Sequence, residues 1–186
     1  MSTTQSDGVL ESVRPVQGAI YGGLAFIAGY ILTVLLLVID SEFEFGNEDH
    51  LFELVGMIFF NGHFVDAETS AAGYSESVNL LSDGSTQLPE LTYTLVPAVV
   101  LFLAGYRLAR SSATQTTTAD EGATLGASVV IGYLPLVALG TVVFEVSEET
   151  FGETFSVAPE MGSALVLAGV LFPVVLGALG GYLSQH

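Results

Sequence analysis

The sequence lacks cysteine, lysine and tryptophan, and its only basic side chains are Arg14, Arg107 and Arg110. Without cysteine, disulfides, thiolate metal sites and cysteine nucleophiles are excluded. Three arginines against twenty carboxylates leave no basic patch that could neutralise phosphates, so we expect no nucleic-acid partner. Hydrophobic residues are plentiful instead, and they make up 51% of the chain.

Four apolar segments contain almost no charge. A helix needs about 20 apolar residues to cross a hydrocarbon core of about 30 Å, and each segment is of about that length. We predict four transmembrane helices in one membrane domain, 15–186, preceded by a polar inner tail, 1–14. The predicted spans are 16–39, 91–109, 125–144 and 164–183.

The arginines predict the orientation of these spans. Arg14 precedes the first span, and Arg107 and Arg110 end the second, so all three lie on one side if the chain starts there. Loops rich in arginine stay in the cytoplasm. The sequence therefore predicts a multi-pass protein of the cell membrane with both termini cytoplasmic and acidic loops outside.

The acidic side chains are divided as unequally as the basic ones. Of the net charge of -17, four carboxylates and three arginines leave only -1 on the predicted inner side. A strongly negative surface is a device of halophilic proteins, and molar salt shortens the Debye length to about 3 Å and screens the self-repulsion. We interpret the acidity as a halophilic surface, typical of haloarchaea.

The predicted outer segment, 40–90, contains a shorter apolar run. Leu51–Val65 has about 15 residues, below the length that spans a bilayer. It fits an interfacial or re-entrant helix that covers the outer end of the bundle.

Two pairs of spans resemble each other in sequence. Gly18-Ala19-x-x-Gly22 corresponds to Gly122-Ala123-x-x-Gly126, and the stretch 95–102 aligns without gaps to 165–172. These matches indicate two duplicated hairpins, related by a parallel pseudo-twofold axis along the membrane normal. The expected fold class is thus all-α, with four transmembrane helices and a short outer helix.

Small residues at four-residue spacing predict close helix contacts. In lipid, helices associate through backbone approach at such positions, within the chain or at the contact surface of a homo-oligomer. The glycines concerned are Gly18, Gly22, Gly29, Gly122, Gly126, Gly132, Gly177 and Gly181. Pro97, Pro135 and Pro173 lie within spans and predict kinks, which are found in transporters and in passive bundles alike.

The spans offer little chemistry. None contains an ionisable group at depth, so a proton-coupled pump is not supported. The metal-ligand types His50, Glu53, His63 and Asp66 could complete a zinc shell, but His63 beside aromatics fits an interfacial hydrogen-bonding role better. We predict no catalytic residue, no cofactor and no metal.

Several stretches resemble a known family. Phe59–Val65, Val96-Pro97-Ala98, Leu103–Arg110 and Gly132–Pro135 are similar to a family of small uncharacterised four-helix membrane proteins of haloarchaea. Some members are loosely labelled transporters, and the resemblance implies no catalytic residues. The hypothesis from sequence is a non-enzymatic integral membrane protein that acts through self-association or as an accessory subunit of a membrane complex. The alternative is a transporter or channel for a small solute.

Overall fold

A computed structural model describes residues 14–40, 48–71, 73–82, 86–113, 118–150 and 153–186. The predicted tail, 1–14, lies outside these residues except for Arg14. Four helices in the described part are long enough and apolar enough to cross a membrane. They are α2 (Pro15–Ile39), α4 (Glu90–Ser112), the pair α5 (Ala119–Ala127) and α6 (Val130–Val143), and the run of α7 (Met161–Ser163), η2 (Ala164–Leu171) and α8 (Phe172–Leu183).

The clearest break in a span helix does not lie at a proline. The third span breaks at Ser128–Val129, where Ile131 bonds back only three residues, to Ser128 O at 3.1 Å. Pro135 lies inside α6, and α4 continues through Pro97. Pro173 is the second residue of α8, directly after the π-helical segment η2.

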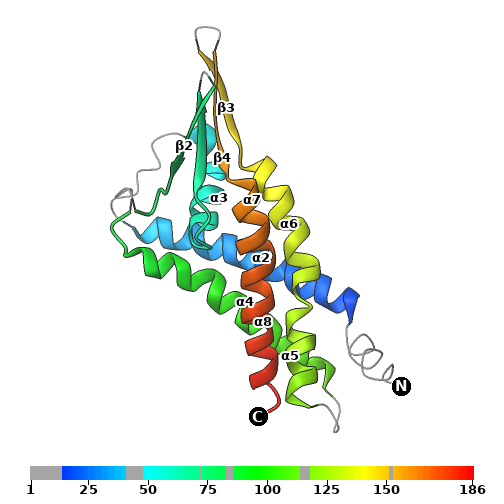
Figure 1. The fold of residues 1–186 in the computed structure, drawn as a ribbon. Coiled ribbons are helices and arrows are strands. Elements are labelled where there is room, and N and C mark those ends of the chain that lie inside the picture. The colour runs from blue at the N-terminus through cyan, green and yellow to red at the C-terminus, as the bar shows by residue number, and fades with distance from the viewer. Residues whose placement is uncertain (1–13, 41–47, 72, 83–85, 114–117, 151–152) are drawn as a thin grey trace, which may run out of the picture.

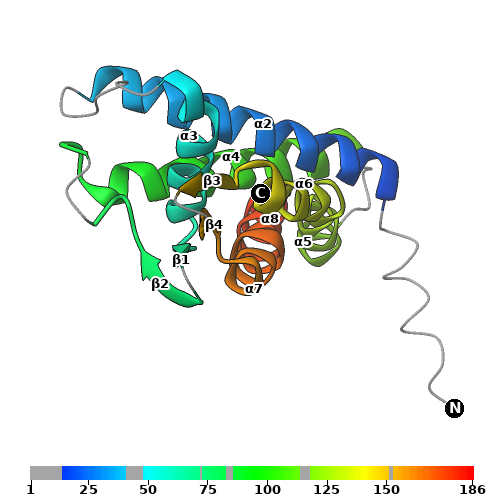
Figure 2. The same cartoon turned by 90° about the horizontal axis from the view of Figure 1, so that it is seen from above.

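The two helical hairpins cross each other. Seen from above, α2 and α4 run lengthwise while α5, α6 and α8 are viewed almost end-on (Figure 1, Figure 2). We call the end with Arg14 and Arg110 the arginine end and the opposite one the sheet end. The hydroxyl of Ser112 donates to Gln17 Oε1 at 2.9 Å and joins α4 to α2 at the arginine end.

A four-stranded antiparallel sheet corrects the all-α prediction. Its strands are β1 (Ala67–Ala71), β2 (Tyr74–Val78), β3 (Val146–Thr150) and β4 (Glu153–Pro159), in the order β2-β1-β4-β3. It projects beyond the helices at the sheet end (Figure 1). The central pair, β1 with β4, joins the two long interhelical segments, with Ala67 opposite Pro159 and Ala71 opposite Phe155.

The short apolar run forms a helix inside the bundle. After η1 (Glu48–His50), α3 spans Leu51–Asn61, and every residue from Val55 to Asn61 is buried. From Val55 to Phe60 this helix is apolar on every side, and such a segment belongs in a core. It therefore fills the space between the crossing hairpins instead of lying on their surface.

Candidate functional site

The polar centre of the fold is a contact between His63 and Tyr133. His63 Nε2 lies 2.7 Å from the hydroxyl of Tyr133, and His63 Nδ1 lies 2.9 Å from the carbonyl oxygen of Phe59. Both side chains are at most 1% exposed. Tyr133 comes ten residues before the end of α6, about 15 Å along a helix at 1.5 Å per residue. The chain between the first two spans thus places an imidazole well inside the bundle.

The geometry determines which atoms carry the protons. A carbonyl oxygen can only accept, so His63 Nδ1 is protonated and donates to Phe59. In the neutral ring Nε2 is then an acceptor, and the hydroxyl of Tyr133 donates to it. Burial lowers the pKa of His63 to about 4, because no water solvates the charged form there. The neutral ring is therefore the stable form near neutral pH.

Aromatic rings surround this pair. The ring of Phe59 meets that of His63 edge-on at a centroid distance of 4.8 Å, and Phe172 lies 5.1 Å from it. Phe26 contacts Tyr133 at 5.4 Å. Such edge contacts add stability beyond burial alone. The pair is enclosed by rings from three different helices, α2, α3 and α8.

The residues around His63 each have a local role. Buried Asn61 donates from Nδ2 to Val65 O at 2.7 Å and accepts from the Leu80 N–H at 3.0 Å. Phe64 has a φ of 61°, a left-handed conformation that is unusual for a non-glycine residue. Together they reverse the chain after α3 and lead it into β1.

A second polar contact closes the first long interhelical segment. The carboxylate of Asp40, which is 4% exposed, accepts hydrogen bonds from the N–H groups of Gln87 and Leu88 and from the hydroxyl of Tyr93. These bonds join the end of α2 to the start of α4. Among the described residues, no buried side-chain nitrogen or oxygen is left without a partner.

The structure separates the metal-ligand types that the sequence places close together. His50 lies 3.5 Å from Glu148 of β3, and Asp66 accepts from Ser77 and Asn79. His63 is bonded to Tyr133, and Glu53 lies in the first turn of α3. Within the described ranges, no three His, Asp or Glu side chains are grouped so that they could hold a metal ion.

All eight glycines expected at helix contacts lie at contacts within the chain. A Cβ on Gly126 would overlap the carbonyl oxygen of Gly177, and one on Gly22 would overlap that of Val129. Gly29 differs, because it faces the ring of Phe59. The other contacts pair Gly18 with Ser128, Gly132 with Ala19, and Gly122 with Gly181. Backbones therefore touch directly in the half of the bundle nearer the arginine end.

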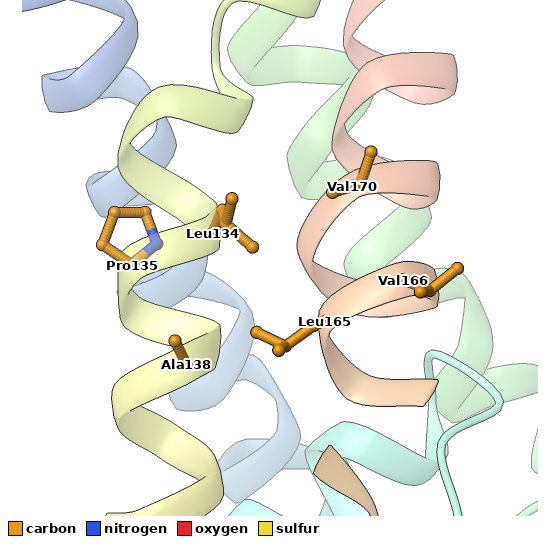
Figure 3. Close-up of a pocket in the computed structure, with 6 residues that line it drawn as sticks. All are labelled: Leu134, Pro135, Ala138, Leu165, Val166 and Val170. Atoms are coloured by element: carbon orange, nitrogen blue, oxygen red, sulfur yellow. The ribbon is translucent and has the colours of Figure 1, made fainter. Parts of the chain in front are cut away.

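Apolar grooves lie between neighbouring helices. Figure 3 shows one of about 520 Å³ between α6 and η2, into which Leu134 and Leu165 point from opposite sides. Val166 and Val170 line it and are largely exposed. Two further grooves, between α2 and α4 and between α4 and α8, are also apolar. These surfaces suit lipid chains.

Sequence reasoning found the members of the site only in part. His63 is expected from the sequence to be a hydrogen-bonding residue, but Tyr133 lies 70 residues away and no local pattern pairs the two. The acidic and basic side chains of the described span helices lie near helix ends, such as Glu90 and Arg110 in α4, yet a histidine enters the bundle from the segment between two spans. The apolar run directly before His63 is the one signal that could have indicated this depth.

These features define the class: a mostly helical protein with four helices able to cross a membrane and a small antiparallel sheet at one end. The chain belongs to the family of unknown function DUF7978, whose model matches residues 1–186. No curated protein and no solved structure matches the chain.

Proposed function

We propose that the protein is a non-enzymatic integral membrane component that acts through protein contacts, by self-association or as an accessory subunit. The observation that carries this proposal is a tightly packed helical core that supports a projecting sheet, whose edge strands β2 and β3 each have one side without a neighbouring strand among the described residues. The buried hydrogen bonds of His63 and Asp40 join different segments of the chain and hold this core together. The exposed surface of the sheet is left for recognition.

The packing of the core favours this reading over a solute path. Rings of Phe26, Phe59 and Phe172 fill the space around His63 and Tyr133. Transport sites in membranes need polar groups that face a cavity. The three grooves between neighbouring helices described above are apolar instead, which supports a closed scaffold.

We also propose the orientation. Arg14 is the residue before α2, and Arg110 lies in the last turn of α4, so both belong to the arginine end. Positive charge marks the cytoplasmic side. The arginine end then faces the cytoplasm, and the sheet projects outside the cell.

Size measurement and cross-linking test the proposed function. Native membranes are extracted in mild detergent at high salt, and the mass of the particle is measured before and after chemical cross-linking. We expect a particle larger than one protein chain plus its detergent, and a cross-linked product that includes the sheet. A strict monomer with no co-purifying protein would contradict the proposal.

The acidic composition gives a further proposal, that the protein is adapted to high salt. At -17, self-repulsion destabilises the folded chain unless it is screened. We expect the unfolding temperature in detergent to rise steadily from about 0.1 M to about 2 M KCl. A flat or falling profile would argue against halophilic adaptation.

A further inference from the structure

The sheet carries a row of four serines across one face. Ser147 lies opposite Ser156, Ser156 opposite Ser70, and Ser70 opposite Ser75. Directly opposed residues point to the same side of a sheet, so these hydroxyls form one continuous row. We call this side the serine face.

Acidic residues flank the row. Two positions further along the strands, Glu149 opposes Thr154 on one side of the row, and Glu68 opposes Ala158 on the other. Both carboxylates are exposed, and no aromatic or long apolar side chain lies on this face in the described strands. The surface is flat, polar and negative.

The row ends at an open strand edge. β3 is the last strand of the sheet, so one side of its backbone has no neighbouring strand among the described residues. Exposed edges pair readily with another extended chain. Charged side chains usually discourage such pairing, and β3 has the adjacent carboxylates Glu148 and Glu149 at its centre.

A second copy of the chain does not complement this edge. It has no lysine, and its three arginines are Arg14, Arg107 and Arg110, which lie at the arginine end in α4 or directly before α2. Two such edges would bring like charges directly opposite each other, which is destabilising. Glu148 already has His50 at 3.5 Å on the other face, whereas Glu149 lies beside the serine row. A strand that complements this edge with positive charge would therefore come from a different protein.

We propose that the free edge of β3 binds an extended, arginine- or lysine-bearing segment of another protein as an added strand. The cationic side chains lie over the serine face, where they reach Glu149 and the serine hydroxyls. Backbone hydrogen bonds to the edge supply affinity, and alternate side chains supply specificity. This inference rests on the proposed function and names the chemistry of the partner.

Peptide binding to the full-length protein in nanodiscs tests the inference. The probes are a fluorescent peptide of alternating threonine and arginine, a variant with prolines in place of two threonines, and a variant with glutamate in place of arginine. We expect the arginine peptide to bind, and the proline peptide, which cannot complete the strand, to bind roughly tenfold more weakly. Equal binding of these two would show charge attraction alone and overturn the proposal, as would no binding of the arginine peptide.

Charge reversal locates the site. In Glu149→Lys, we expect the arginine peptide to bind about fivefold to tenfold more weakly and the glutamate peptide to gain affinity. The matched control is Glu76→Lys, at the opposite edge and on the other face of the same sheet, where we expect a change of at most about twofold. Equal effects of the two variants would show a diffuse field and contradict a site at β3. If the peptides fail while cross-linking still recovers a partner, the proposed function stands and only this inference is lost.

Discussion

The two halves of the helical bundle are packed on different principles. Towards the arginine end, helix backbones touch through glycines such as Gly126 and Gly177. Towards the sheet end, the hairpins diverge and α3 fills the space with aromatic rings and the pair of His63 and Tyr133. Helices pack closely near the arginine end because glycine has no side chain. Near the sheet end, large side chains from distant segments fill the space between the helices. The two halves should therefore respond differently to the same small change.

The largest effect is expected from adding one methyl group where backbones touch. In Gly126→Ala the new Cβ would overlap the Gly177 carbonyl oxygen, and neither helix backbone can yield without moving its neighbours. We expect a loss of about 3 kcal/mol in the free energy of unfolding, measured by denaturant titration in detergent. The matched change in the other half, Gly140→Ala, meets only the ends of the Phe60 and Phe144 rings at 3.1 Å and should cost about 1 kcal/mol. Equal losses would remove the distinction between the halves.

Acidification should weaken the sheet-end half selectively. The pKa of His63 is lowered from 6.5 to about 4 by burial, so the unfolded chain binds a proton that the folded chain does not. The free energy of unfolding should be constant above about pH 6.5 and fall by on the order of 3 kcal/mol as the pH drops to about 4. Thermal unfolding across this range measures it. His63→Leu should abolish the slope, while His50→Gln should keep it.

The carboxylate of Glu160 contributes to stability in a different pH range from His63. Hydrogen bonds from the Ser163 side chain and from the N–H groups of Ser163 and Gly162 lower the pKa of Glu160 below its usual 4.5. Its contribution is present above pH 4.5 and is lost only as the pH falls further. A slope that survives in His63→Leu between pH 5 and 6.5 would contradict the assignment to His63.

Removing one hydroxyl tests the buried pair itself. Tyr133→Phe leaves the ring in place but deprives His63 Nε2 of its donor, which should cost about 2 kcal/mol. The double variant with His63→Leu should lose less than the sum of the two single losses, because the partners no longer depend on each other. Strictly additive losses in chemical denaturation would show that the 2.7 Å contact contributes nothing.

The smallest effect is expected at a glycine that faces open space. A Cβ on Gly23 would meet only the Leu136 Cδ1 atom at 3.7 Å, so Gly23→Ala should be neutral or stabilise the helix by up to about 1 kcal/mol. The adjacent Gly22→Ala should behave like Gly126→Ala, since Tyr133 N would lie 2.8 Å from the new carbon. Thermal melts of the two neighbours side by side test the register of α2. A large loss at Gly23 would show that this register is wrong.

The difference between the halves also explains what the sequence could predict. Span length and hydropathy indicate the four helices directly, and the predicted 16–39 matches α2, Pro15–Ile39, closely. Glycine spacing is a local pattern as well, so it indicated the arginine-end contacts. Hydropathy and glycine spacing can each be recognised within a stretch of sequence about as long as one helix.

The sheet and the polar pair could not be read in this way. The strand β2 reads Tyr-Ser-Glu-Ser-Val and is exposed over most of its length, so it lacks the alternation that marks a half-buried strand. It pairs with β1, and β1 pairs on its other side with β4, where Ala67 lies opposite Pro159, far along the chain. Likewise, the sequence of α3, a helix of 11 residues, does not predict which aromatic rings it packs against.

We propose that the arginine end and the sheet end lie on opposite sides of a membrane. Because the chain has no native cysteine, single cysteines can be labelled without background. We would introduce Ser111→Cys after the arginines of α4 and Ser147→Cys on β3, both at exposed positions, and treat intact cells with a membrane-impermeant maleimide. We expect labelling of the Ser147 position only, with the Ser111 position reached after the cells are opened. Labelling of the Ser111 position in intact cells would contradict it.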